Sequence, residues 1–533
     1  MSLESREMGA AVGQPLVLAL DIGTSSVRAA LYDCAGAEVE GTQARLTRAL
    51  CTSLDGGAEL DAGQAIEQAA QVIDEALSRF AHLDAEIEAV AVSCFWHSLV
   101  GIDGAGRPRT PVLGWADTRA ARFAEELRRR FDEGATHART GCPFHPSYWP
   151  AKLLRLRAEE AESYRAVRRW LSFGELLASA FFGETQMSVS MASGTGLLNL
   201  RTCEWDEELL AGLGLARELL PEIAGAGKAF VRLKGEYARR WPRLRNARWF
   251  PAVADGAASN VGAGCTTRER VALMIGTSGA MRSMWEGEPP EALPGALWCY
   301  RVDRRRVLVG GALSDGGGLY GWLADSLALP ADASAREDAL AQMEPDAHGL
   351  TVLPFWAGER SPGWSTEARG AILGLTMHTS PIEILRAAME AVAYRFALIA
   401  APLDGFAPGA EVIGSGGALL SSPVWAQVLA DVLGRPVRLS GVGEASSRGA
   451  ALLALEATGK LKSIHQAPAP AADAYEPDAA RQARYRAGLE RQQQLYARLV
   501  GDAGLAALLG GGRPGARAAD ALRCETPAEH PPR

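Results

Sequence analysis

The tetrapeptide Ile-Gly-Thr-Ser occurs twice in this chain, each time directly after a short apolar run. The first copy begins at Ile22 and the second at Ile275, and a further apolar run follows each of them. Each unit is therefore predicted to be a β-hairpin with a polar turn. Because the same hairpin recurs so far along the chain, the sequence indicates that one type of domain has been duplicated.

The segments around these hairpins alternate between strand-like and helix-like patterns. Strands are expected at 87–93, 307–313 and 412–413, and helices at 66–80, 120–131, 382–400 and 423–433. This alternation is typical of α/β proteins. The chain has 533 residues, which is too long for one core at roughly 100–200 residues per domain. Two large α/β domains are therefore predicted.

The domain boundaries follow from the second hairpin and from composition at the two ends. We expect a first domain over 16–265 and a second domain over 266–500. Residues 1–15 are predicted to be a disordered arm. Residues 510–533 are rich in Gly, Pro and Ala and are predicted to be a disordered tail.

Composition excludes several classes of protein. The net charge is −8, from 63 acidic and 55 basic residues, and without a long basic stripe no nucleic-acid partner is expected. No run of about 18 apolar residues occurs, so no membrane span is predicted, and no apolar leader is seen at the N-terminus. The eight cysteines include no C-x-x-C pair, so no structural zinc site is expected. Their number is low for the length of the chain, which fits reduced thiols in a cytoplasmic protein.

The two polar turns are candidate phosphate-binding loops. Their backbone N–H groups and hydroxyls can surround phosphate oxygens; the residues are Gly23, Thr24, Ser25 and Ser26, then Gly276, Thr277 and Ser278. A plain hairpin tip explains either copy alone, but the repeat favours two loops that hold one nucleotide. A third loop, at Gly416, Gly417 and Ala418, follows a strand and opens a helix, which suits a bound adenosine.

Three charged residues are candidates for the chemistry of phosphoryl transfer. Asp21 ends the first strand, where a carboxylate can hold Mg²⁺ directly or through water. Arg28 is placed to neutralise charge on the transferred group. Asp255 follows an apolar run and is the candidate base that accepts the proton of an alcohol. The alternative for both aspartates is an ordinary turn or capping role.

Two aromatic and polar segments suit a sugar pocket. Trp96 and His97 follow a strand, and Asp117 and Arg119 precede a helix; together they offer an apolar face and hydrogen-bonding groups. A core tryptophan and an N-capping aspartate are the alternatives. The glycines of 316–321 match G-x-G-x-x-G, but the acidic strand end of a dinucleotide site does not follow them.

As a set, these segments resemble the FGGY family of carbohydrate kinases. The similar segments are LALDIGTSSVRAALYD, PAVADGAASNVGAG, MIGTSGAMR, GERSPGWSTEARGAILGLT and VIGSGGALLSSPVWAQVLADVLGRPV. The resemblance implies two actin-like, ribonuclease-H-type domains with a cleft between them. It implies that ATP and Mg²⁺ are used and that Asp255 is the catalytic base. Ser415 stands where the family's adenosine loop usually has glycine.

Within the family, FWHSLVGID and GWADTRA are most similar to gluconate kinases. The resemblance implies phosphorylation of gluconate, or a close aldonic acid. Because an unpaired buried charge is costly, its carboxylate needs a cation or several donors, and the candidates are His97, Arg119 and Lys152. A neutral sugar or polyol such as xylulose is the alternative substrate. Two other classes stay open: an actin- or Hsp70-like ATPase, and a sugar-binding regulator without catalysis. For the assembly, a homodimer is kept as an option.

Overall fold

The computed structural model describes residues 15–81, 85–467, 469–502, 505 and 523–524. The predicted arm, apart from Pro15, lies outside these residues, as does most of the predicted tail. Within the segment predicted as a tail, β23 (Arg523–Cys524) pairs antiparallel with β4 (Cys51–Thr52). Cys51 is disulfide-bonded, which corrects the expectation of reduced thiols at that position.

Both predicted hairpins are present, and each opens a sheet in the same way. β1 (Leu16–Ile22) pairs antiparallel with β2 (Ser26–Tyr32) and parallel with β6 (Ile87–Cys94). β14 (Arg270–Ile275) pairs antiparallel with β15 (Gly279–Glu286) and parallel with β20 (Glu411–Ser415). The shared pairing pattern confirms the duplication that the repeated tetrapeptide predicts.

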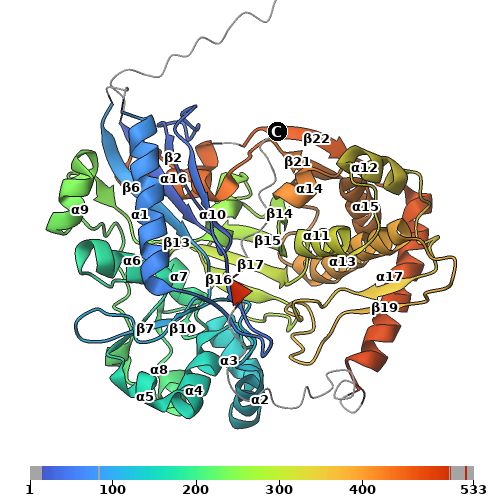
Figure 1. Cartoon of the computed structure of the whole chain (residues 1–533), viewed down its shortest axis with the longest axis horizontal. Helices are drawn as coiled ribbons and strands as arrows, with labels where there is room; N and C mark the ends of the chain where they lie inside the picture. The colour runs from blue at the N-terminus through green and yellow to red at the C-terminus, as the bar shows by residue number, and fades with distance from the viewer. Residues whose placement is uncertain (1–14, 82–84, 468, 503–504, 506–522, 525–533) are drawn as a thin grey trace, which may run out of the picture.

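The two sheets form the centres of the two halves of the molecule (Figure 1). The first has the order β12-β6-β1-β2-β3, with β13 also paired to β6, and the second has the order β16-β17-β15-β14-β20-β21-β22. The further strands are β3 (Ala44–Thr47), β12 (Arg248–Trp249), β13 (Val253–Ala254), β16 (Trp298–Arg301), β17 (Arg306–Leu313), β21 (Val437–Ser440) and β22 (Ala471–Tyr475). Apolar, fully buried strands such as β1 and β17 form the core of each half.

The predicted helices are confirmed within a few residues of their expected ends. They are α1 (Ala62–Arg79), α2 (Ala121–Arg130), α13 (Pro381–Leu403) and α15 (Pro423–Leu433). α13 begins where the sequence expects it, because Ser380 and Glu383 form a capping box and Pro381 occupies the first turn. Among the described residues, no helix is both long and apolar enough to cross a membrane.

A close helix pair connects the two halves. α10 (Asp255–Gly262) packs on α16 (Ala445–Thr458), which also packs on β1 and β6. A Cβ at Gly262 would overlap the backbone of Ala445, and one at Gly449 would overlap that of Ala258. These two glycines therefore let the helix backbones touch. The contact fixes the start of α10, where Asp255 lies, against the first sheet.

Candidate active site

The ends of three neighbouring strands bring the predicted catalytic residues together. Asp21 pairs with Ser93 across β1 and β6, and β13 runs parallel to β6 with Ala254 opposite Cys94. Asp255 follows β13 directly and begins α10. Because the carboxyl ends of parallel strands share one edge of a sheet, Asp21, Asp255 and the segment 95–97 meet there.

The electrostatics of Asp255 suit a general base. Desolvation raises the pKa of its carboxyl to about 6, with a nearby Asp21 adding to the increase and Arg282 opposing it. The backbone N–H of Gly256 donates to its Oδ1 at 2.7 Å. A carboxyl with a pKa near neutrality is largely ionised at pH 7 and still basic enough to accept a hydroxyl proton.

Asp21 and Arg28 form part of a bridge between carboxylates. Arg28 Nη1 lies 3.3 Å from Asp21 Oδ2 and 3.2 Å from Glu444 Oε2. Burial raises the pKa of Asp21, and Arg28 counteracts that increase. Asp21 in turn raises the pKa of Asp255, and both residues lie at the same edge of the first sheet. Paired carboxylate oxygens are the donors that Mg²⁺ prefers, so this pair fits the ion.

The second predicted phosphate loop is held by the start of a helix. Within the loop, Gly276 N–H donates to Ser278 O at 3.0 Å. The N–H groups of Gly317 and Gly318, at the start of α11 (Gly317–Ser326), donate to Gly276 O at 2.7 Å and Thr277 O at 2.9 Å. The first loop closes similarly, with Gly23 N–H donating to Ser26 O at 2.9 Å.

The G-x-G-x-x-G stretch has a packing role in this arrangement. A Cβ at Gly316 would stand 2.8 Å from the carbonyl of Ser278, and one at Gly318 would stand 3.0 Å from Thr277. Glycine lets α11 approach the phosphate loop closely enough for its N–H groups to bond there. This gives a structural reason for glycines that the sequence alone leaves compatible with a dinucleotide site.

The predicted adenosine loop lies beside the second phosphate loop. Gly416 has φ 91°, and a Cβ there would overlap the carbonyl of Ile275. A Cβ at Gly417 meets no described atom within 4 Å, whereas one at Gly317 would stand 2.5 Å from the Ala418 Cβ. Ser415, the departure from the family pattern, is buried at the end of β20, and its hydroxyl has no partner within the described part of the chain.

A cavity between the two halves joins the base to the second phosphate loop. Both Asp255 and Ser278 line it. The remaining wall is mainly aromatic and basic and includes Trp96, His97, Arg282, Trp298, Tyr300 and Arg360. Trp298 and Tyr300 stack at 4.1 Å between ring centroids, and Trp96 lies 4.6 Å from Tyr300. Such walls suit the C–H faces of a sugar.

His97 is presented to this cavity as a neutral ring. Its Nδ1 lies 2.6 Å from Gly194 O, and since a carbonyl can only accept, Nδ1 carries the proton. Burial lowers the pKa of His97 to about 3. The residue has φ 66°, an uncommon backbone conformation outside glycine. In this tautomer Nε2 is an acceptor, which suits a substrate hydroxyl but not a carboxylate.

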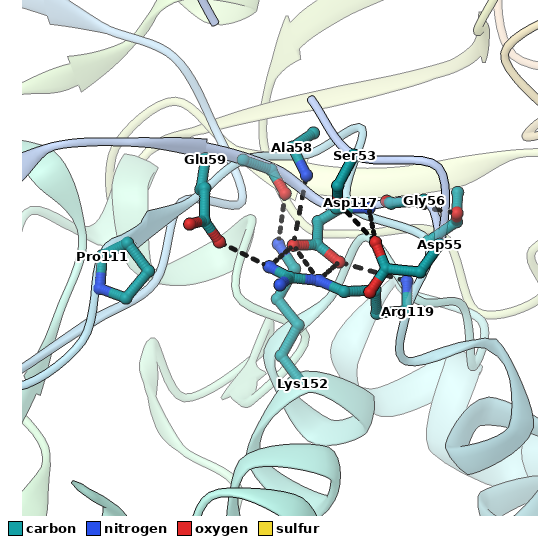
Figure 2. Close-up of polar contacts among 12 residues, drawn as sticks. Ser53, Asp55, Gly56, Ala58, Glu59, Pro111, Asp117, Arg119 and Lys152 are labelled. Atoms are coloured by element: carbon teal, nitrogen blue, oxygen red, sulfur yellow. Dashed lines mark hydrogen bonds and ion pairs between the residues drawn. The ribbon is translucent and has the colours of Figure 1, made fainter. Parts of the chain in front are cut away.

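Asp117, Arg119 and Lys152 lie outside the described lining of the cavity. Figure 2 shows Arg119 between two carboxylates: Nε lies 3.1 Å from Asp117 Oδ1, and Nη2 lies 2.7 Å from Glu59 Oε2. Lys152 Nζ donates to the carbonyls of His97 at 2.7 Å and Gly114 at 2.8 Å. Lys152 thus supports the backbone of His97, whereas Asp117 and Arg119 are bonded to each other and Arg119 also to Glu59.

The structure adds basic and aromatic residues that the sequence interpretation missed. Arg282 lies on β15, two residues beyond Ala280, so both project from the same face of the strand into the cavity. Arg360 donates from Nη2 to Leu313 O at 2.7 Å and packs on the Trp115 ring at 4.5 Å. Period-2 alternation after the second turn could have identified Arg282. Tyr148 and Tyr300, whose hydroxyls are 2.6 Å apart, carry no comparable signal.

Comparison with known proteins gives a consistent result over most of the chain. Models of the FGGY family of carbohydrate kinases match residues 16–262 (N-terminal domain) and 271–458 (C-terminal domain). A gluconokinase of Bacillus subtilis is 29% identical over 464 residues, covering 84% of this chain and 88% of that protein.

Two solved structures are similar in fold. A gluconate kinase from Lactobacillus acidophilus has a TM-score of 0.82 and 26% identity, covering 92% of this chain and 99% of that one. A xylulose kinase from the same organism has a TM-score of 0.83 and 26% identity, with the same coverage. The overall architecture is thus shared by kinases of an acidic and a neutral sugar.

Proposed function

The chain belongs to the FGGY family of carbohydrate kinases, and we propose that it uses ATP to phosphorylate gluconate, or a close aldonic acid, on its terminal hydroxyl. The observation that carries the proposal is one cavity lined by Asp255, Ser278 and the arginines Arg282 and Arg360. The candidate base, the predicted phosphate loop and two positive charges all line this one cavity, which supports the proposal. The similarity to gluconokinases supports the choice of substrate.

In the proposed reaction, the acceptor hydroxyl forms a bond to the γ-phosphorus of ATP while the bond from that phosphorus to the β,γ-bridging oxygen breaks. Asp255 takes the hydroxyl proton, and ADP leaves with the electron pair of the broken bond. The turns at 23–26 and 276–278 would hold the phosphates through backbone N–H groups and hydroxyls. Arg28 stabilises the carboxylates beside the reaction rather than standing free for the transferred group.

Asp21, with Asp255 beside it, would hold the Mg²⁺ that accompanies ATP. When bound, the ion neutralises phosphate charge and orients the γ-phosphoryl group. The role of the protein would be to present both carboxylates at one edge of the first sheet. Gly416, Gly417 and Ala418 would support the adenosine next to the second phosphate loop.

The test is ADP release with a panel of acceptors: gluconate, other aldonic acids, xylulose, glycerol and further neutral polyols. We expect kcat/KM for gluconate to exceed that for every neutral acceptor by at least tenfold, about 1.4 kcal/mol. A higher value for xylulose would support the neutral-sugar alternative, which the similarity to a xylulose kinase favours. ADP release that is independent of any acceptor would instead indicate an ATPase, and sugar binding without ADP release would indicate a regulator.

A further inference from the structure

Arg282 differs from the other buried arginines of the protein. It is 6% exposed, and its Nε and Nη1 atoms have no hydrogen-bond partner among the residues that the structure describes. Each of the other buried arginines has at least one hydrogen bond or ion pair; they are Arg48, Arg155, Arg301, Arg306, Arg386, Arg395 and Arg448. Asp255 interacts with the charge of Arg282 through space, but buried N–H donors that lack a hydrogen bond are costly, so Arg282 is expected to meet an anion that a ligand brings.

The sheet leaves room for this side chain to face the cavity. Arg282 is opposite Gly310 on β17, and Gly310 is opposite Trp298 on β16. A Cβ at Gly310 would stand 3.1 Å from Arg282 Cγ, so a larger residue there would displace the arginine. Arg282 and Trp298 therefore face the same cavity across a glycine.

The position of Arg282 along its strand favours an anion on the acceptor over one on ATP. β15 begins at Gly279, directly after the second phosphate loop. Arg282 is three residues further on, about 10 Å along an extended strand. The phosphates are expected at the loop end, whereas Arg282 lies beside the wall formed by Trp96 and Trp298, where a sugar chain would lie.

The charges of the residues that line the cavity also favour an anion on the acceptor. Among its described lining residues, Arg282 and Arg360 face a single carboxylate, that of Asp255. Arg360 is already held by Leu313 O and the Trp115 ring. His97 is a neutral acceptor through its contact with Gly194 O, and the cations first considered, Arg119 and Lys152, are bonded elsewhere. The described lining of the cavity therefore carries one more positive than negative charge.

We propose that Arg282 binds the carboxylate of the acceptor and thereby selects aldonic acids over neutral sugars, with Arg360 supporting the same charge. The inference rests on the proposed gluconate kinase function. A guanidinium whose Nε and Nη1 bond to no described residue can offer two parallel N–H donors to a carboxylate, the geometry in which arginine binds such groups most strongly.

The experiment compares gluconate with gluconamide, its neutral analogue of the same length, in the wild type, Arg282→Gln and Arg282→Lys. The wild type should prefer gluconate. Arg282→Gln should lose about 10²-fold in kcat/KM for gluconate and less than about threefold for gluconamide, and Arg282→Lys should keep part of the preference. An equal loss on both substrates, or a rise in the KM for ATP alone, would overturn the proposal.

A binding measurement without ATP separates this role from an effect on Asp255. Quenching of the cavity tryptophans should report gluconate binding to the wild type, and Arg282→Gln should lose it even if turnover is too low to measure. If Arg282→Gln does not fold, Arg282→Lys decides the matter: an unchanged gluconate preference in that variant rejects a bidentate contact. A wild type that phosphorylates only neutral sugars refutes the proposed function itself, whereas a gluconate preference that survives in Arg282→Gln refutes only this inference.

Discussion

Gly416 lies directly against Ile275: a Cβ on Gly416 would stand 2.6 Å from the carbonyl carbon of Ile275. Two loops that are far apart in sequence, one predicted for adenosine and one for phosphate, are therefore in backbone contact. The contact needs glycine twice over, because Gly416 also has φ 91°. A substitution at Gly416 consequently disturbs the phosphate loop before it touches any nucleotide.

This contact predicts different effects for valine at Gly416 and at Gly417, two positions that the sequence assigns to the same adenosine loop. Gly416→Val should lower the melting temperature and raise the KM for ATP, since it distorts the second phosphate loop. Gly417→Val introduces its side chain where no described atom lies within 4 Å, so it should leave the melting temperature unchanged and still raise the KM for ATP if adenosine lies there. An unchanged KM in a stable Gly417→Val protein would place adenosine elsewhere.

Asp255→Asn should reduce turnover by roughly 10²–10⁴, the usual contribution of a positioned base. The fold should not suffer. Because folding raises the pKa of Asp255 to about 6, the ionised carboxyl destabilises the native state at pH 7, and asparagine removes that cost. The variant should melt at the same or a higher temperature than the wild type at pH 7, with the difference vanishing near pH 3. A marked loss of melting temperature would assign Asp255 a structural role.

The pH dependence of kcat/KM should report the ionisation of the Asp255 carboxyl. With a pKa of about 6, the base is protonated in acid, so kcat/KM should fall about tenfold per pH unit below pH 6 and level off above it. Asp255→Glu should keep an acid limb at a shifted pH. A profile that stays flat from pH 5 to 8 in the wild type would contradict the assignment of the base.

Asp21→Asn tests the metal site. Removing one of the two carboxylates proposed to hold the ion should raise the Mg²⁺ concentration needed for half-maximal activity and leave gluconate binding, measured without ATP, within about twofold of the wild type. Arg28 would then keep Glu444 as its partner, so the protein should stay folded. Loss of gluconate binding with an unchanged Mg²⁺ requirement would reverse the assignment.

The sequence predicts the fold and the candidate catalytic residues of this protein better than its substrate specificity. The repeated turn at Ile22 and Ile275 sufficed for the duplicated fold, because local hydrophobic pattern and turn chemistry determine hairpins. Asp21 and Asp255 could be placed because Asp21 lies at the end of one strand and Asp255 directly follows another. The cation in the cavity, Arg282, could not be predicted, because contacts between residues far apart in the sequence decide whether an arginine has an ion-pair partner. Arg119 finds Glu59 across sixty positions of the chain, whereas Arg282 finds no such partner in the part of the chain described.

Arg119→Gln tests whether Arg119, which forms ion pairs within the protein, has a structural role rather than the substrate-binding role proposed for Arg282. Arg119 neutralises Asp117, which is 1% exposed, and Glu59, which is 9% exposed. Its removal leaves two enclosed carboxylates without a cation, and breaking a buried pair typically costs about 3–5 kcal/mol. We expect a clear fall in the melting temperature, partly restored in Arg119→Lys, which keeps the charge. Because Arg119 lies outside the described cavity lining, the KM for gluconate and its preference over gluconamide should stay within about twofold of the wild type in the folded fraction. A stable Arg119→Gln protein that has lost its preference for gluconate would instead move carboxylate recognition from Arg282 to the segment that precedes α2.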